Sequence, residues 1–392
     1  MLNLERLERM RRAMQNERLD ALVLRLPENV LLLSGFWPMI GATYLVFPLD
    51  GVPHAIVPHC YEMEAARSLW EGNVSHYTYG VLDAEPAHIA VAKSLAGIVQ
   101  GKHWRRIGFE ERFDVAAPSW NTAEFLAPSV QHRELLSSVF PSAEPVDVST
   151  LIQVQRRTKT PYEMDKLRIA SEISSIGLRS FDEIVKVGVS GVALAARVEH
   201  DIMALGTGQH GTFRVRAFAQ VAVGPEETAV GYRPNEVSTT RRLADGEVAL
   251  LELGVVVDGY WADRTRVRVA GNATDEQLRI FDTVRAAQEA AVIEMRPGVK
   301  AAQVDEAARS VIRAAGYEKH FPHITGHGLG FRYHESSPML APQSPEVLEE
   351  GMLTSVEPGI YKAPAGGFRI EDDVFVVKGG AEVLGPHPKH LV

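Results

Sequence analysis

The sequence predicts a two-domain α/β protein, and three observations carry this prediction. The chain of 392 residues is long enough for two hydrophobic cores, and its 45% hydrophobic and 23% charged residues are ordinary for a globular protein. Short apolar runs alternate with longer segments of helical periodicity, which favours a mixed or parallel sheet. A turn-rich stretch, 141–154, separates the two halves. We therefore expect domains at 1–155 and 156–392.

Composition excludes several classes of partner. A net charge of -9 argues against nucleic acid or an anionic membrane surface. The single cysteine, Cys60, excludes an intrachain disulfide and fits a reducing compartment. The first residues, Met1 to Arg12, alternate charges and lack the apolar stretch of a signal peptide. No run of about 18 apolar residues occurs either, so we expect a cytoplasmic protein without a membrane partner.

The first half contains the elements of an α/β sheet and no evident chemistry. Apolar residues at helical spacing predict a helix over Leu4–Asn16. Further along we expect strands at 19–24 and 106–109, a helix at 89–99, and apolar segments at 30–33, 43–47 and 54–57. His54, His59 and Cys60 lie close in sequence, but without a second cluster of ligands we interpret them as local packing.

The second half begins with a strong helix-start signal. Thr160 suits the N-cap, with Pro161 at the first helical position and Glu163 at the third, so a long helix is expected from there to about Val185. A second helix follows at Gly191–Leu205. Beyond it the patterns predict strands at 213–223, 248–257 and 261–269, and helices at 275–295 and 302–314.

The stretch 250–266 reads as two strands rich in Val and Leu, joined by Asp258-Gly259, a dipeptide that favours a two-residue hairpin turn. The register that follows pairs Val257 with Tyr260, Gly254 with Asp263 and Glu252 with Thr265. Glu252 and Asp263 then share one face, and Gly254 between them leaves room for a bound group. Two converging carboxylates repel unless they are protonated or bridged by a cation. The hairpin alone leaves open whether these acids bind a metal or are simply solvated.

Three later segments carry further polar residues beside apolar runs. Residues 323–335 hold His323, His327 and His334 in a glycine-rich surround, where backbone and ligand can approach closely. Residues 355–360 end a strand at Glu357. Residues 369–377 alternate Arg369, Glu371 and Asp373 with Ile370, Asp372 and Val374. Carboxylates so near a buried strand need a neutralising partner, which an arginine and cations would provide.

The order of these motifs resembles that of the pita-bread metallopeptidase family, which includes methionine aminopeptidase, Xaa-Pro aminopeptidase, prolidase and creatinase. The resemblance rests on the hairpin acids followed by Gly-His-Gly-Leu-Gly at 326–330, Glu-Pro-Gly at 357–359 and Arg-Ile-Glu-Asp at 369–372. In the first half, 19–22 and 29–36 are similar to the creatinase-type N-terminal domain of that family. The resemblance therefore implies that domain, followed by a pita-bread catalytic domain.

The resemblance also implies a site. The family's five metal ligands fall on Glu252, Asp263, His327, Glu357 and Glu371, which implies two divalent cations, with Mn, Co or Fe favoured by this ligand set and Zn admissible. Glu357 matches the family's acid–base glutamate and His334 its substrate-contacting histidine. His323 and Arg369 match supporting polar groups at the substrate. Assembly as a homodimer is implied as well.

Two positions depart from the family pattern. Glu252 stands where the family has an aspartate, which adds roughly 1.5 Å of reach and can alter the metal spacing. Asn235 stands where a histidine normally helps to hold the substrate carbonyl. Asparagine can donate a hydrogen bond but cannot carry a proton.

The leading interpretation is a metal-dependent hydrolase of a C–N bond in a small peptide, an Xaa-Pro dipeptidase or aminopeptidase. One alternative is a creatinase-like or ectoine-hydrolase-like enzyme that acts on a small non-peptide amide or amidine. Another is a binding protein that keeps the fold and has lost catalysis. The intact set of ligands argues against the metal-free chemistry of creatinase and against the loss of catalysis.

Overall fold

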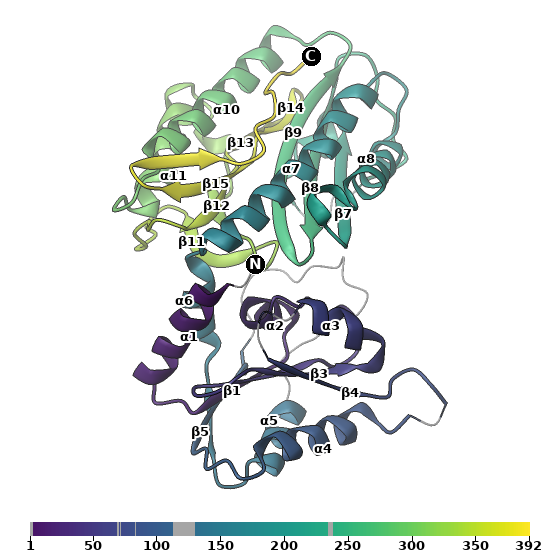
Figure 1. Cartoon of the computed structure of the whole chain (residues 1–392). Coiled ribbons are helices and arrows are strands. Elements are labelled where there is room, and N and C mark those ends of the chain that lie inside the picture. The colour runs from purple at the N-terminus through teal and green to yellow at the C-terminus, as the bar shows by residue number, and fades with distance from the viewer. Residues whose placement is uncertain (1–2, 69, 71, 83, 113–129, 234–237) are drawn as a thin grey trace. The chain divides into compact units, whose positions relative to one another are not determined.

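The computed structural model describes residues 3–68, 70, 72–82, 84–112, 130–233 and 238–392. These residues form two compact units, of which one ends at Arg156 and the other begins at Arg157 (Figure 1). Among the helices of the described ranges, none combines the length and the hydropathy that a membrane span requires.

The first unit is built on a six-stranded mixed sheet. Its strands follow the order β4-β3-β2-β1-β5-β6, with β1, β2 and β3 antiparallel and the outer pairs parallel. The strands are β1 (Ala21–Leu24), β2 (Tyr44–Pro48), β3 (His54–Pro58), β4 (Asn73–Tyr77), β5 (Arg106–Phe109) and β6 (Glu144–Asp147). The helices are α1 (Leu4–Asn16), α2 (Pro27–Ser34), α3 (Glu62–Ser68), α4 (Ala87–Val99), α5 (Val130–Val139) and α6 (Ser149–Arg157). The predicted mixed α/β layout is thus confirmed.

Two segments of this unit differ from the sequence expectation. The apolar segment 30–33 lies inside α2, which is buried on all sides and therefore shows no helical periodicity. The stretch 141–154, expected to be turn-rich, instead contains β6 and most of α6. Strand β6 lies at the sheet edge and includes Pro145, so propensity gave no strand signal there.

The second unit begins with two helices against a three-stranded sheet. Helices α7 (Pro161–Ile184) and α8 (Gly191–Gly206) pack on the sheet β7-β8-β9 (Figure 1). Thr160 and Glu163 form the predicted capping box at the start of α7. The strands are β7 (Val215–Val223), β8 (Glu247–Val257) and β9 (Tyr260–Ala270), and a short helix α9 (Gly224–Thr228) follows β7.

The rest of this unit is a second sheet covered by two more helices. Helices α10 (Asp275–Glu294) and α11 (Ala301–Ala314) share one hydrophobic core with residues of β12, β14 and β15. The sheet has the order β11-β10-β12-β15-β16, and β13 pairs with β14. These strands are β10 (Gly326–Gly328), β11 (Glu335–Leu340), β12 (Leu353–Val356), β13 (Gly359–Lys362), β14 (Gly366–Arg369), β15 (Asp372–Val377) and β16 (Gly380–Val383).

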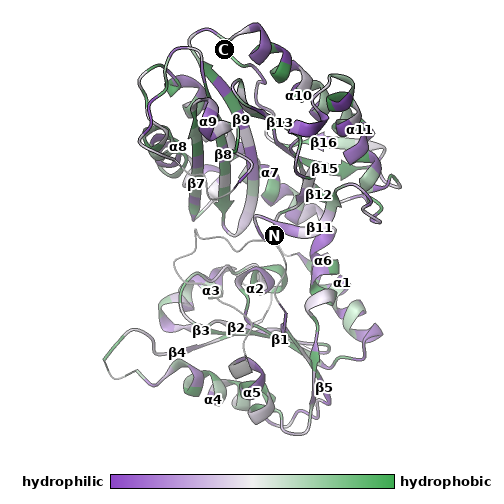
Figure 2. Ribbon diagram, turned by 180° about the vertical axis from the view of Figure 1, so that it is seen from behind, coloured by the Kyte–Doolittle hydropathy of each residue, from purple (hydrophilic) through white to green (hydrophobic). Residues whose placement is uncertain are grey.

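The β8–β9 hairpin has the register that its turn predicts. Glu252 lies opposite Thr265 and Gly254 opposite Asp263, while Asp258 and Gly259 take φ values of 48° and 93°. Positive φ at both turn residues is the geometry that Asp-Gly supplies. Strand β8 is mostly hydrophobic, as Figure 2 shows, and Glu252 is a charged residue within this hydrophobic strand.

Candidate metal centre

The five residues expected to bind metal converge where the two sheets of the second unit meet. Glu252 comes from β8, Asp263 from β9 and His327 from β10, whereas Glu357 follows β12 and Glu371 precedes β15. Ligand atoms lie within 4.8 Å of one another in three groups: Asp263, His327 and His334; His327, Glu357 and Glu371; and Glu252, Asp263 and Glu371. The structure therefore brings all five together, with His334 beside them.

Backbone hydrogen bonds between strands fix this convergence. The amide of Glu371 donates to the carbonyl of Thr265 (3.2 Å), which joins the strand that carries Asp263 to the segment that carries Glu371. The amide of Glu357 donates to the carbonyl of Thr325 (2.7 Å), two residues before His327. Asp373, on β15, accepts the amide of Asp263 (3.1 Å). Hydrogen bonds between the strands and the segments that adjoin them thus position the acids.

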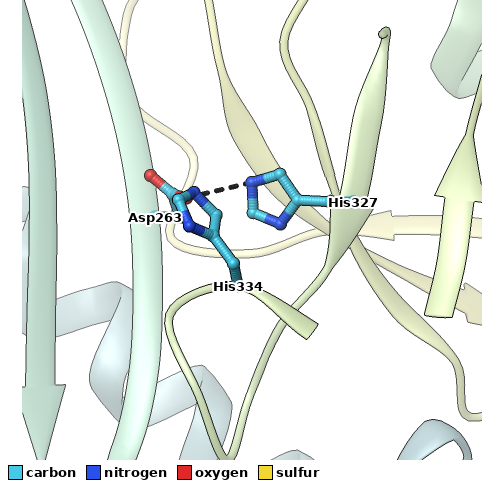
Figure 3. Close-up of side chains that lie close together, drawn as sticks. All are labelled: Asp263, His327 and His334. Atoms are coloured by element: carbon cyan, nitrogen blue, oxygen red, sulfur yellow. Dashed lines mark ion pairs between the residues drawn. The ribbon is translucent and has the colours of Figure 1, made fainter. Parts of the chain in front are cut away.

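His327 has the tautomer that a metal ligand needs. Its Nδ1 lies 2.9 Å from the carbonyl oxygen of Gly328 and must donate, because a carbonyl can only accept. Its Nε2 then presents a lone pair 3.4 Å from Asp263 Oδ2 (Figure 3). The same nitrogen lies 3.4 Å from Glu357 Oε1. Burial lowers the pKa of His327 to about 3, so the imidazole is neutral at physiological pH.

Two carboxylate oxygens of the cluster lack a hydrogen-bond donor. Asp263 Oδ2 and Glu371 Oε1 are buried and accept no hydrogen bond from any described residue. Burial raises the pKa of both groups well above the ordinary value, and the neighbouring carboxylates raise it further. Buried carboxylates of this kind require either protons or a cation. The four carboxylates and one neutral imidazole of the five expected ligands are a donor set that suits divalent transition metals.

Glu252 has a different environment. Its Oε1 accepts the Tyr333 hydroxyl, and its Oε2 accepts the Arg369 guanidinium and the Thr265 hydroxyl, the last at 2.7 Å. Burial alone would raise the pKa of Glu252, but Arg369 and the two hydroxyls lower it to about 2. Glu252 is therefore ionised and already paired inside the protein.

Arg369 connects the cluster to His323. Its NH1 donates to the Tyr361 hydroxyl (2.7 Å), which lies 2.9 Å from His323 Nε2, while His323 Nδ1 faces the carbonyl of Ile324 (2.8 Å). Burial lowers the pKa of His323 to about 3, so the hydroxyl donates to a neutral imidazole. His323 thus contacts the cluster through Tyr361 and Arg369, and its contact with substrate stays a prediction.

His334 and Asn235 complete the predicted residues. The His334 ring packs edge-on against His327, with centroids 4.3 Å apart, and both rings point toward Asp263 in Figure 3. Burial lowers the pKa of His334, so it is neutral as well. Asn235 lies outside the described residues, and its expected contact with substrate stays a prediction.

Sequence reasoning missed three hydroxyls and misjudged one glycine. The hydroxyls of Tyr333 and Thr265 donate to Glu252, and that of Tyr361 accepts from Arg369. The sequence pattern pointed only to Thr265, as the cross-strand partner of Glu252. The space over Gly254 was expected to admit a bound group. The structure corrects this, because a Cβ on Gly254 would lie 2.0 Å from the Phe218 ring, which fills that space. Phe218 in turn packs edge-on against Tyr333, with centroids 4.8 Å apart.

Comparison with known proteins agrees with this geometry. The sequence profile of metallopeptidase family M24 matches residues 165–378, and that of the creatinase/prolidase N-terminal domain matches 6–158. The chain is 31% identical over 348 residues to an Xaa-Pro dipeptidase of Lactobacillus helveticus, covering 88% of this chain and 86% of that one.

Two solved structures extend the similarity to the whole chain. The prolidase from Pyrococcus horikoshii OT3 has a TM-score of 0.79 at 25% identity, covering 99% of this chain and 100% of its own. An Xaa-Pro dipeptidase from Bacillus anthracis has a TM-score of 0.80 at 26% identity, covering 99% of each chain. The fold, the order of the acids and these matches agree, and the chain belongs to metallopeptidase family M24, the pita-bread enzymes that hydrolyse peptide bonds with divalent metals.

Proposed function

We propose that this enzyme is an Xaa-Pro dipeptidase that binds divalent cations through Glu252, Asp263, His327, Glu357 and Glu371. The observation that carries the proposal is the pair of buried, donorless oxygens on Asp263 and Glu371, beside an imidazole whose free nitrogen faces them. The names of the relatives support the substrate class, since several of them are prolidases or Xaa-Pro dipeptidases. Mn, Co and Fe fit the ligand set best, and Zn is admissible.

Within this proposal Glu357 moves the proton. A bound cation would supply a water of lowered pKa and polarise the scissile carbonyl. Burial raises the pKa of Glu357 to about 8, and Arg369 opposes that rise. A carboxyl group that titrates near neutrality can take a proton from water and return it to the leaving nitrogen. Ser355 donates to Glu357 Oε1 (3.0 Å) and orients it.

Other residues would bind and orient the substrate. His334 is a neutral imidazole beside His327, which suits a hydrogen bond to the peptide. Arg369 and His323 are held in one hydrogen-bonded chain through Tyr361. On the sequence alone, Asn235 is proposed to face the substrate carbonyl. A homodimer also stays a prediction, which sedimentation of the purified protein tests.

The test is a substrate panel with the purified protein after reconstitution with Mn²⁺. The panel compares Xaa-Pro dipeptides, Xaa-Pro tripeptides, dipeptides without proline, and small amides such as creatine and ectoine. We expect release of free proline from the dipeptides, dependent on metal and abolished by a chelator. Turnover of a small amide without cleavage of any dipeptide would favour the non-peptide alternative. Less than about one equivalent of bound metal would contradict the metal site.

A further inference from the structure

Strand β9 carries polar side chains on both of its faces. Asp263 and Thr265 contact the acids of the candidate metal centre. Because side chains alternate along a strand, the residues next to them face the other way, and these are Arg264, Arg266 and Arg268. All three arginines are buried. A group of guanidinium ions in the protein interior requires hydrogen-bond acceptors and negative charge.

Asp372 supplies negative charge to these arginines. Its Oδ1 accepts from Arg264 (3.0 Å) and from Arg266 (2.7 Å), and its Oδ2 accepts from Gln288 (3.2 Å). The Nζ of Lys389 lies 3.0 Å from the same Oδ2. Burial would raise the pKa of Asp372, but the three cations around it hold that pKa well below its usual range. Asp372 is therefore ionised although it is buried.

The segment 385–391 supplies further acceptors to the arginines. The carbonyl of Gly385 accepts from Arg264 (2.9 Å), and the carbonyl of His387 accepts from Arg266 (3.2 Å). Both bonds come from the same guanidinium nitrogens that bind the carboxylate behind the centre. The segment therefore completes the hydrogen bonding of both arginines.

Two more contacts hold the segment 385–391 in place. The carbonyl of Leu391 accepts the amide of Val269 on β9 (2.9 Å). Lys389 donates to the side-chain oxygen of Gln288 (2.7 Å) in addition to its ion pair with Asp372. The segment is thus bound to β9 through its backbone and to Asp372 through one charged side chain.

The arginines connect the same two stretches of backbone that meet at the metal centre. Arg266 also donates to the carbonyl of Glu371 (2.8 Å), so it binds both residues of the stretch 371–372. On the other face, Asp263 Oδ2 and Glu371 Oε1 accept no hydrogen bond from the described residues. Without a cation these two carboxylates repel when ionised. The arginines and Asp372 oppose that repulsion, because they tie β9 to the stretch 371–372 from behind.

We propose that Asp372 and the segment 385–391 position the metal ligands from behind, so that docking of the segment and binding of a cation strengthen each other. Asp372 and Lys389 are positioning residues in this proposal, since they act through the arginines and the backbone of Glu371. The coupling is reciprocal: docking of the segment strengthens cation binding by the same factor by which a bound cation strengthens docking. The inference rests on the proposed metal-dependent function.

The first test measures Mn²⁺ binding to metal-free protein by calorimetry. Lys389→Met removes the charge and keeps the length of the side chain, and it should weaken Mn²⁺ binding by at least about threefold. Asp372→Asn removes the central charge and should weaken binding by at least about tenfold. Lys389→Arg keeps the positive charge and should bind Mn²⁺ as the wild type does. The Lys389 side chain is partly exposed, so Lys389→Met keeps the test valid even where Asp372→Asn does not fold.

Two controls separate positioning from a general loss of stability. Ile312→Val removes a methylene from the core of the same unit, in helix α11, and lowers stability without touching the arginines. Lys378→Met removes an exposed lysine of the same unit. Both variants should bind Mn²⁺ as the wild type does. Circular dichroism at the temperature of the titration shows that each protein is folded.

Hydrogen exchange gives an independent readout of docking. The Val269 amide is bonded to the Leu391 carbonyl, so its exchange reports release of the segment. By reciprocity, Mn²⁺ should slow exchange of this amide in the wild type by at least about threefold. The Asn73 amide, which is bonded to the Pro53 carbonyl in the first unit, should exchange at the same rate with and without Mn²⁺.

Several results would overturn the inference. Equal Mn²⁺ affinity of Lys389→Met and the wild type would do so, as would an equal loss of affinity in Ile312→Val. A Val269 amide that exchanges at one rate with and without Mn²⁺ would show that docking and cation binding are independent. A wild-type protein that binds no Mn²⁺ would refute the proposed metal site, and this inference with it.

Discussion

Two glutamates in one buried cluster differ in pKa because their neighbours differ. Burial pushes the pKa of both Glu252 and Glu357 upward. Glu252 has direct bonds from Arg369, Tyr333 and Thr265, and its pKa falls to about 2. Glu357 has one hydroxyl partner and a more distant arginine, and its pKa rises to about 8. This separation supports the proposed proton-carrying role of Glu357, and it leaves Glu252 with a negative charge.

Replacement of Glu357 by glutamine tests that assignment. The amide keeps the shape of the side chain but cannot accept a proton, so kcat on an Xaa-Pro dipeptide should fall by about 10²–10⁴-fold. Bound metal, measured by elemental analysis, should remain at one equivalent or more, because the amide oxygen can still face a cation. Glu349→Gln, an exposed glutamate paired with Arg157, serves as the control and should keep full activity. If Glu357→Gln kept more than about a tenth of the wild-type rate, another residue would have to be the general base.

At the scale of elements, the sequence predicted most of the second unit and less of the first. The capping box at Thr160 and the Asp258-Gly259 turn are local signals, and both elements form as expected. Helix α2 and strand β6 lacked such signals, since one is buried all round and the other is a short edge strand. The resemblance in motif order implied the proposed ligand set, whose five side chains the structure brings together. The bonds of Tyr333 to Glu252 and Asp263 did not, because they join residues 70 and 81 positions apart and depend on packing.

The close approach of Phe218 to Gly254 links the hairpin to the centre. A methyl group at Gly254 would overlap the Phe218 ring, which is confined by Tyr333 and Trp261. Gly254→Ala should therefore lower the free energy of unfolding by about 1–3 kcal/mol and displace the Tyr333 hydroxyl. Gly380→Ala is the control, because a Cβ there meets nothing within 4 Å, and it should change stability by less than about 0.5 kcal/mol. Chemical denaturation compares the two variants, and equal stability of both would show that the ring yields without cost.

At the scale of the whole molecule, the two units bury different titratable groups in different surroundings. In the second unit, the buried acids Asp263 and Glu371 lie in the candidate metal centre, where cations can compensate them. The first unit instead buries a histidine, His132, against the rings of Tyr44 and Phe109, with centroids 5.5 and 5.8 Å away. Burial, with a smaller contribution from nearby Arg25, lowers the pKa of His132 from 6.5 to about 3. A fall in pH should therefore destabilise the first unit, because His132 binds a proton more readily when the chain is unfolded.

The sign of the effect follows from proton binding. Between pH 6.5 and 3 the unfolded chain binds a proton at His132 and the folded chain does not, so stability is lost as the pH falls through that window. Well inside this window, the free energy of unfolding falls by about 1.4 kcal/mol for each pH unit. Between pH 7 and pH 5, His132→Leu should consequently lose about 2 kcal/mol less stability than the wild type.

Urea denaturation at both pH values, followed by circular dichroism and tryptophan fluorescence, measures the difference. The comparison uses the change between the two pH values within each protein, so a general loss of packing in His132→Leu cancels. His88→Leu removes an exposed histidine of the same unit and should show the wild-type dependence on pH. If His132→Leu and the wild type lose stability in parallel, the imidazole binds a proton equally in both states, and the acid sensitivity of this unit arises from its carboxylates.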